Sequence, residues 1–252
     1  MQHLDLKNSL GDSPILFIKR TTSTMNEARA LAETGCGHGT VIMAGYQTAG
    51  RGRTGERRWI SNPGDNLLCT IIFRKNLLQS SFSQLPLRFG VAVSKALAHL
   101  FSLQAKIKWP NDVLVNHRKI AGILCEATPA FVFAGLGVNC NQPKFVLPEE
   151  KPAVSVGEMT ESGVEIPGLL EVLLDYIKES IEDNNWRAYL NERLYGKGRM
   201  VHVTGTDDET KHGWKGTISE IGAEGQLVLL SAGIAERREL FGGEITFLDD
   251  RA

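Results

Sequence analysis

The sequence predicts an α+β protein, with an α+β domain over residues 1–195 and a small β-barrel over residues 196–252. Helix-like and strand-like segments are interspersed in the first part, whereas the last part holds only short strand-like runs about ten residues apart. The stretch Gly196-Lys197-Gly198 marks the change. A length of 252 residues suits one large domain, or a medium domain with a small companion, and can bury a core without disulfides.

The first helix is predicted at Thr24–Ala32. Thr24 and Glu27 have the spacing of a capping box, apolar residues recur on one helical face, and Gly35 and Gly37 end the segment. This spacing therefore predicts that Thr24 caps the helix with its hydroxyl group.

Strand-like and helical segments then follow one another. Compact apolar runs predict strands at Thr40–Tyr46 and Asn66–Arg74, and apolar residues at helical spacing predict a helix over Leu85–Leu103. Pro110 separates two strand-like segments, Lys106–Trp109 and Asp112–Val115. The other expected segments are a turn at Asn116-His117 that closes a hairpin with Lys119–Ala127, a strand at Ala130–Asn139, a helical region over Leu169–Leu194, and barrel strands at Met200–Thr204, Gly213–Ile221, Gln226–Leu230 and Arg237–Phe241.

The composition is that of an ordinary globular chain, with 42% hydrophobic residues, 23% charged residues and a net charge of -1. This balance argues against a globally basic nucleic-acid binder and leaves local basic patches open. Neither a signal peptide nor a transmembrane helix is expected, which favours a cytoplasmic protein. The four cysteines lack the spacing of a zinc site and are expected to be idle or buried thiols: Cys36, Cys69, Cys125 and Cys140.

The densest charged segment is the loop Gly50–Trp59, which holds four arginines within eight residues. Gly50, Gly52 and Gly55 match the letters of the dinucleotide fingerprint, but no helix begins there and no acidic residue occurs at 70–75, so we reject that interpretation. Guanidinium groups and glycine backbone amides both favour phosphate or carboxylate oxygens. A solvated basic loop and a nucleic-acid contact are the alternatives.

Two further clusters hold candidate functional residues. Asn111 and Asp112 begin a strand, and Lys119 opens the next strand, where a half-buried ammonium group needs an anionic partner. The alternative for Lys119 is a side chain that extends to solvent. Glycines within Gly135–Asn139 indicate either the close approach of a ligand or a β-bulge. The isolated histidines are interpreted as structural.

In this order, the motifs resemble those of the biotin protein ligases, in the short form that lacks an N-terminal DNA-binding domain. The matching segments cover essentially the whole chain: Ser23–Met25, Tyr46–Arg53, Trp59, Lys108–Asp112, Arg118–Leu124, Gly135–Asn139 and Phe241–Ile245. The arginine loop combined with the Lys-Trp-Pro-Asn-Asp segment is the specific part of this resemblance.

The resemblance implies a mixed β-sheet flanked by helices, of the class II synthetase type, joined to a small SH3-like barrel. It also implies a reaction in two steps. Biotin and MgATP form biotinyl-adenylate and pyrophosphate, and a lysine of a biotin carboxyl carrier protein domain of a carboxylase then attacks the adenylate and releases AMP. Biotin, ATP and Mg²⁺ are therefore expected ligands, and a homodimer is compatible with the sequence.

The resemblance also assigns roles by position. The residues expected to neutralise the reacting anions are Lys119, Arg51 and Arg53. The expected biotin contacts are Ser23, Thr24, Met25, Gln47, Arg51, Gly52, Arg53, Lys119, Gly122, Leu124, Gly135 and Gly137. The expected nucleotide contacts are Gly50, Arg53, Asn111, Lys119 and Asn139, with Asp112 as the metal ligand.

One departure from the family pattern concerns the arginine loop. The loop is one residue longer than usual, and Glu56 stands where an arginine is expected, so that Arg57 takes that role only by a shift of register. Both residues are therefore left out of the assigned site.

Three other functions compete with biotin ligation. A lipoate or octanoate protein ligase or transferase shares the fold class. A biotin-operon repressor needs an N-terminal helix-turn-helix domain of about 60 residues, whereas only about 20 residues precede Ser23, so direct DNA binding is not expected. A pure binding module would bind biotin without exchanging pyrophosphate.

Overall fold

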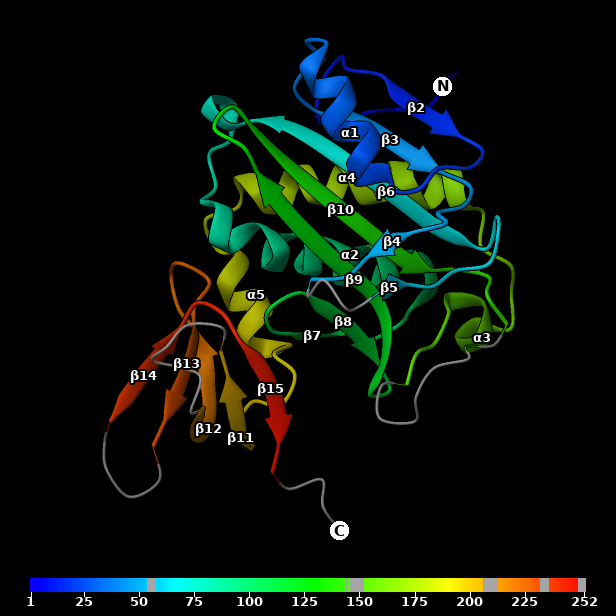
Figure 1. Cartoon of the computed structure of the whole chain (residues 1–252). Helices are drawn as coiled ribbons and strands as arrows, with labels where there is room; N and C mark the ends of the chain where they lie inside the picture. The colour runs from blue at the N-terminus through cyan, green and yellow to red at the C-terminus, as the bar shows by residue number, and fades with distance from the viewer. Residues whose placement is uncertain (54–57, 144, 146–151, 206–212, 232–235, 249–252) are drawn as a thin grey trace.

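Eight strands form the central sheet of the computed structural model, which describes residues 1–53, 58–143, 145, 152–205, 213–231 and 236–248 (Figure 1). The strand order is β1-β2-β3-β6-β10-β9-β8-β7. β2 and β3 run parallel and the other neighbouring strands run antiparallel, so the sheet is mixed, as expected. The strands are β1 (Gln2–Leu4), β2 (Ile15–Ile18), β3 (Thr40–Ala44), β6 (Asn66–Arg74), β7 (Lys106–Lys108), β8 (Asp112–Val115), β9 (Arg118–Ala127) and β10 (Phe131–Asn139).

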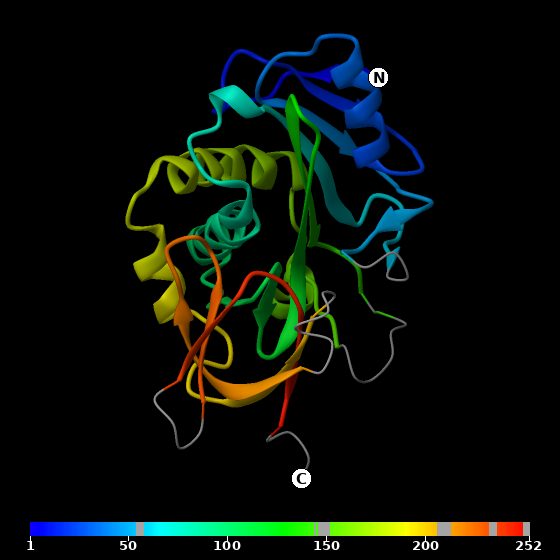
Figure 2. The same cartoon turned by 60° about the vertical axis from the view of Figure 1, so that its left-hand side comes forward.

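Helices cover both faces of this sheet (Figure 2). α2 (Leu85–Phe101) and α4 (Ile166–Glu182) lie on one face, and α1 (Thr24–Glu33) lies on the other. The shorter helices are α3 (Val156–Thr160), α5 (Trp186–Glu192), and two 3₁₀ turns at Lys75–Leu77 and Phe82–Gln84.

The alternation of side chains along β10 separates the two faces. Val132, Ala134, Leu136 and Val138 enter the main core on the side of α2 and α4, and Phe133 enters the smaller cluster beneath α1. Gly135 and Gly137 share the face of Phe133 because they lie two and four residues further along the strand. The sheet therefore presents almost no side chains at that part of its surface.

The start of α1 differs from the sequence-based prediction. Ser23, not Thr24, is the N-cap residue, and its hydroxyl accepts a hydrogen bond from the Met25 amide at 3.3 Å. The Glu27 carboxylate accepts from the Thr21 hydroxyl at 2.5 Å, so the expected capping box is not formed. The Thr24 hydroxyl is bonded to side chains of other elements, which local spacing does not reveal.

The turn between β8 and β9 forms as expected. Asn116 and His117 both have positive φ, 48° and 63°, as a two-residue hairpin turn requires. Asn66–Arg74 matches its predicted bounds in full.

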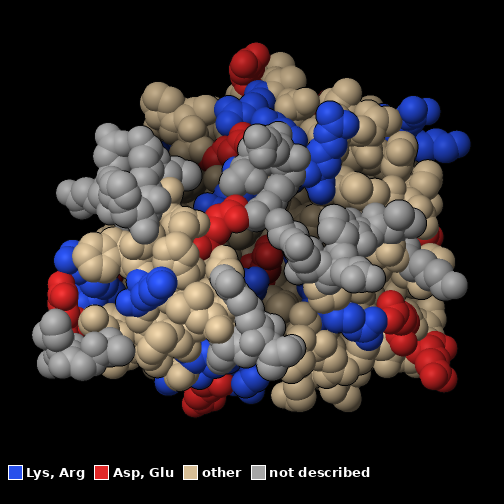
Figure 3. All heavy atoms as spheres, turned by 60° about the horizontal axis from the view of Figure 1, so that its bottom comes forward, with Lys and Arg blue, Asp and Glu red and all other residues tan. Residues whose placement is uncertain are grey.

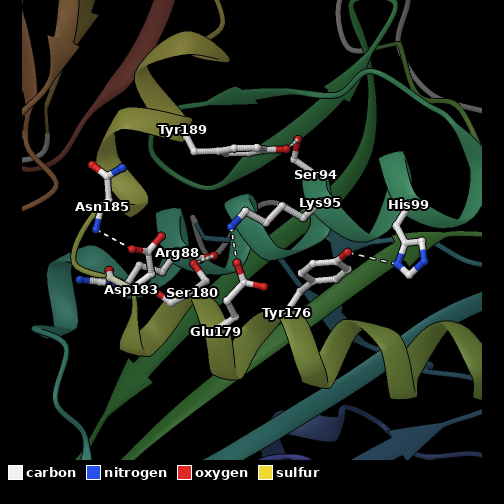
Figure 4. A network of polar contacts seen from close by, with 10 residues as sticks. All are labelled: Arg88, Ser94, Lys95, His99, Tyr176, Glu179, Ser180, Asp183, Asn185 and Tyr189. Atoms are coloured by element: carbon white, nitrogen blue, oxygen red, sulfur yellow. Dashed lines mark hydrogen bonds and ion pairs between the residues drawn. The ribbon is translucent and has the colours of Figure 1, made fainter.

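The helical region expected over Leu169–Leu194 is divided into α4 and α5 by residues 183–185. Arg88 of α2 stabilises this break (Figure 4). Its buried guanidinium donates to the backbone carbonyls of Ser180, Ile181 and Asp183, and it lies 4.7 Å from the ring of Trp186. A charged donor from another helix thus satisfies the carbonyl groups that end α4.

The C-terminal part is a five-stranded antiparallel sheet of order β14-β13-β12-β11-β15. Its strands are β11 (Met200–Thr204), β12 (Trp214–Ile221), β13 (Leu227–Leu230), β14 (Arg237–Leu240) and β15 (Glu244–Phe247), the last of which the sequence did not predict. β14 and β15 are the two edges, and no ladder between them closes a barrel among the described residues.

This sheet packs on the end of the large domain rather than standing alone. Its core includes Val201 and Leu229 together with Leu87 of α2 and Trp186 of α5. The buried Trp109 indole donates to the Gly225 carbonyl at 3.1 Å. The domain boundary between residues 195 and 196 stays a prediction.

Among the described residues, no helix is long and apolar enough to cross a membrane. The expectation of buried thiols is met at two positions. Cys69 and Cys140 are buried free thiols, and burial raises the pKa of each to about 12.

We expect Arg88→Met to lower the free energy of unfolding by about 2–4 kcal/mol, because three buried carbonyls lose a charged donor. Lys7→Met is the control, since it removes an exposed ion pair with Asp175 and should cost less than about 1 kcal/mol. Urea unfolding followed by circular dichroism measures both. Equal free energies of unfolding for the two variants would show that Arg88 does not stabilise the break between α4 and α5.

Candidate active site

Three glycines form a bare strip on the α1 side of the sheet: Gly122 of β9 with Gly135 and Gly137 of β10. We call it the glycine strip. Gly122 pairs with Gly137, and Leu124 pairs with Gly135. β10 pairs with both neighbouring strands without a register shift, so the bulge considered from the sequence is wrong and close approach is the reason for these glycines.

The groups that approach the glycine strip are the side chains of Trp59 and Met25. A Cβ atom at Gly137 would lie 2.6 Å from Cε2 of Trp59, and one at Gly135 would lie 3.1 Å from Sδ of Met25. Half-buried Leu124 packs beside them against the α1 cluster. The strip therefore accommodates a flat group laid on the sheet.

The N-terminus of α1 forms one wall of this site. The Gln47 side-chain oxygen accepts from the Thr24 amide at 2.7 Å and from the Thr24 hydroxyl at 3.0 Å. The Thr24 hydroxyl in turn accepts from Thr70 of β6 at 2.8 Å. Ser23, Thr24 and Met25 are all buried, so the structure brings this expected group together with Gln47.

A two-stranded flap lies over the strip, on the same side of the sheet as α1 (Figures 1 and 2). It consists of β4 (Gly50–Arg51) and β5 (Arg58–Trp59), with Gly52 and Arg53 continuing β4; we call residues 50–53 and 58–59 the flap. A Cβ atom at Gly50 would lie 2.7 Å from the Trp59 carbonyl oxygen. The two strands can therefore pair this closely only with glycine at position 50.

Trp59 is the residue that joins the flap to the strip. Its half-buried ring lies against Gly122 and Gly137, and its buried Nε1 has no hydrogen-bond partner in the described structure. The hydroxyl of Ser61, two residues on, is likewise buried without a partner. Unsatisfied buried donors are costly in a protein, so they mark a site where a ligand can contribute an acceptor.

Lys119 and Asp112 form an ion pair at the end of the strip. Lys119 Nζ lies 2.6 Å from the Asp112 carboxylate and 5.6 Å from the Trp59 ring centroid. Of the two alternatives weighed for Lys119, the structure therefore shows the lysine with an anionic partner. A Cβ at Gly122 would lie 3.0 Å from Nζ, so the ammonium group borders the glycine strip.

Two of the flap arginines, Arg51 and Arg53, point to different parts of the molecule. Arg51 donates to the Asn26 side-chain oxygen of α1 at 3.0 Å and lies 3.6 Å from the Glu126 carboxylate. Arg53 donates to the Gly243 carbonyl at 2.9 Å and lies 3.7 Å from the Glu244 carboxylate. The flap is thus bonded to α1 and β9 on one side and to the C-terminal sheet on the other.

The two expected asparagines bond to the backbone. Asn111 donates to the Ile123 carbonyl at 2.8 Å, and buried Asn139 donates to the carbonyls of Lys119 and Val154 at 3.2 and 3.1 Å. These bonds hold the strands that carry Lys119. A nucleotide contact by either asparagine stays a prediction.

Metal ligands are sparse in the part of the chain that the structure describes, which contains no group of three His, Cys, Asp or Glu residues suited to an ion. Asp112 is the carboxylate beside Lys119. One carboxylate fits Mg²⁺ only when substrate phosphates supply further ligands, which is the usual arrangement for this ion.

Charges of both signs are mixed on the face shown in Figure 3. This arrangement agrees with the near-zero net charge and with the pairing of Arg51 and Arg53 to acidic residues. The site is cationic only locally: the Lys119 ammonium borders the glycine strip, and Arg51 and Arg53 attach the flap that lies over it.

The structure adds residues that the sequence-based assignment left out: Asn26, Trp59, Thr70, Glu126, Gly243 and Glu244. An aromatic residue directly after the arginine loop was a usable signal for Trp59. Asn26 directly follows the assigned Met25, and Gly243 and Glu244 lie in the matching segment Phe241–Ile245, whereas no motif marked Thr70 or Glu126. Glu56 and Arg57 lie outside the described residues.

The chain matches the model of the biotin/lipoate A/B protein ligase family over residues 17–141. It is 30% identical over 237 residues to a biotin–(acetyl-CoA-carboxylase) ligase of Paracoccus denitrificans, which covers 90% of this chain and 89% of that protein. It is also 30% identical over 233 residues to the bifunctional ligase/repressor BirA of Bacillus spizizenii, which covers 81% of this chain and 70% of that protein.

A solved structure has the same fold. The biotin protein ligase from Aquifex aeolicus in complex with biotin and ATP superposes with a TM-score of 0.79 and 26% sequence identity, covering 92% of this chain and 97% of that chain. The likeness includes the C-terminal sheet as well as the large domain, because nearly all of both chains is covered.

We expect Gly137→Ala to displace Trp59, because the added Cβ would lie 2.6 Å from its ring. The free energy of unfolding should fall by about 1–3 kcal/mol, and tryptophan emission should change as the ring leaves the strip. Gly163→Ala is the matched control, since its Cβ would meet no atom within 4 Å. Emission and stability unchanged from wild type would contradict the placement of Trp59.

Proposed function

This chain belongs to the biotin/lipoate A/B protein ligase family, and we propose on that premise that it is a biotin protein ligase. It would form biotinyl-adenylate from biotin and ATP and transfer the biotinyl group to a lysine of a carboxylase carrier domain. The observation that carries the proposal is the glycine strip, covered by Trp59 and bordered at one end by Lys119, beneath a flap that Arg51 and Arg53 attach to the rest of the fold. It is a flat apolar surface with an ammonium group at one end.

The first step joins two anions, so charge neutralisation is the main task of the site. A carboxylate oxygen of biotin attacks the α-phosphorus, a P–O bond forms, and the bond to pyrophosphate breaks. Lys119 is placed to neutralise the meeting carboxylate and α-phosphate, exchanging its pairing with Asp112 for pairing with the substrates. The carboxylate is itself the nucleophile, so no protein nucleophile is needed.

Positioning is the second task. The N-terminus of α1 is held by Gln47 and Thr70, and the Ser23 hydroxyl, which accepts from the Met25 amide, would donate its hydrogen to the bicyclic ring of biotin. The unpartnered Nε1 of Trp59 lies on the strip, where it can donate to an acceptor of the bound substrate. Mg²⁺ bound with ATP would neutralise phosphate charge, with Asp112 as the nearby carboxylate.

The second step needs water to be excluded. The ε-amino group of the carrier lysine attacks the acyl carbon, forms an amide, and releases AMP with loss of a proton. Water that attacked the same carbon would hydrolyse the adenylate. A flap that covers the strip therefore protects the adenylate from hydrolysis. The flap of this chain fits that task because it is fastened on both sides by arginines.

We expect the purified chain to catalyse ATP–pyrophosphate exchange when biotin is supplied, because adenylate formation is reversible. Lipoate and octanoate, supplied separately, are the comparison substrates, since the family also includes enzymes for those acids. Incorporation of labelled pyrophosphate into ATP is the measurement. Exchange with lipoate alone would overturn the assignment to biotin, and biotin binding without exchange would indicate a binding module.

We expect Lys119→Ala to reduce the exchange rate by about 100-fold, because a cation at the meeting anions is lost in a water-poor site. Arg118→Ala is the control: it removes the neighbouring cation, which pairs with Glu158, and should leave the rate within about twofold. Full exchange by Lys119→Ala would remove Lys119 from the catalytic group.

A further inference from the structure

Glu126 lies on the same face of the sheet as the glycine strip but at the other end from Lys119. It is on β9, two and four residues beyond Leu124 and Gly122, and the alternation of strand side chains puts these three on one face. The Lys119 ammonium lies beside Gly122, four residues from Glu126, which in a strand corresponds to about 13 Å. The Glu126 side chain is mostly covered, with 24% exposed.

Two arginines from different elements meet the Glu126 carboxylate. Arg29 of α1 lies 2.5 Å from one oxygen, and its guanidinium stacks 5.0 Å from the ring centroid of Phe133. Arg51 of the flap lies 3.6 Å from the other oxygen, and its second nitrogen donates to Asn26. One carboxylate and one amide oxygen therefore fix the Arg51 side chain from two directions.

This placement separates Arg51 from the reacting end of the site. A guanidinium held at Glu126 does not also meet an anion at the Lys119 ammonium, because that ammonium lies beside Gly122, about 13 Å of strand from Glu126. Arg51 is instead attached to the sheet through Glu126 and to α1 through Asn26. Its attachment fixes the end of β4, whose partner strand β5 carries Trp59 onto the glycine strip.

We propose that Glu126 is a positioning residue for the flap, and that Arg51 acts through it rather than as a catalytic residue. The carboxylate holds the flap down over the strip and so keeps Trp59 in the substrate site. This inference rests on the proposed function for its kinetic part, whereas the attachment itself is testable without any substrate. It replaces the catalytic role that the sequence assigned to Arg51.

Hydrogen–deuterium exchange of the whole chain without ligand tests the attachment. Glu126→Gln should accelerate amide exchange at residues 50–52 about three- to fivefold, because one ion pair of the flap is lost and its opened state is more populated. Arg29→Gln is the matched control, since it removes the other partner of Glu126 and leaves Arg51 in place. Unchanged exchange at residues 50–52 in Glu126→Gln would overturn the proposal.

Pyrophosphate exchange distinguishes positioning from catalysis. If Arg51 acts through Glu126, then Glu126→Gln and Arg51→Gln should each raise the KM for biotin about three- to fivefold and leave kcat within about twofold. The double variant should be no worse than the more impaired single variant, because both remove the same contact. A large loss of kcat in Arg51→Gln, additive with the effect of Glu126→Gln, would overturn the proposal.

The two proposals can fail separately. A wild-type chain without biotin-dependent exchange would contradict the ligase function, and the deuterium experiment would still decide whether Glu126 holds the flap. Biotin-dependent exchange by wild type, together with unchanged deuterium exchange in Glu126→Gln, would leave the ligase function standing and exclude the positioning role.

Discussion

The structure depends on one constraint, the alternation of side chains on β9 and β10. On one face, Val132, Ala134 and Leu136 pack against α2 and α4 and form the main core. On the other face, glycines replace side chains, and the sheet is left bare where Trp59 lies. The same strands therefore provide stability on one side and a binding surface on the other. A one-residue slip of register would exchange the two surfaces, which is why the apolar face also fixes the site.

Three cations of the described site, Lys119, Arg51 and Arg53, each have a partner in another element of the fold. Lys119 pairs with Asp112 of the neighbouring strand, Arg51 with residues of α1 and β9, and Arg53 with the C-terminal sheet. These contacts keep the site electrically balanced without substrate, and they divide the cations by task. Lys119 borders the strip and can turn to a bound anion, whereas the arginines attach the flap to two separate parts of the molecule.

The local structure followed from the sequence wherever a short pattern was decisive. The apolar run Asn66–Arg74 and the turn at Asn116-His117 formed as expected, because burial and turn chemistry act over a few neighbouring residues. The capping box at Thr24 did not form, and the helical region over Leu169–Leu194 formed as two helices. In both cases a distant residue decided: Gln47 bonds to Thr24, and Arg88 satisfies the carbonyls that end α4.

The sequence by itself determined the mixed α+β organisation, the family resemblance, and which segments carry the glycines, arginines and lysine of the site. Only the tertiary structure decided how these side chains are used. It placed Trp59 on the glycine strip, paired Lys119 with Asp112, and attached Arg51 to Glu126, a residue 75 positions away that no motif had marked. The reason is physical: motifs record chemistry along the chain, whereas ion pairs and close packing depend on distances that exist only once the strands have paired.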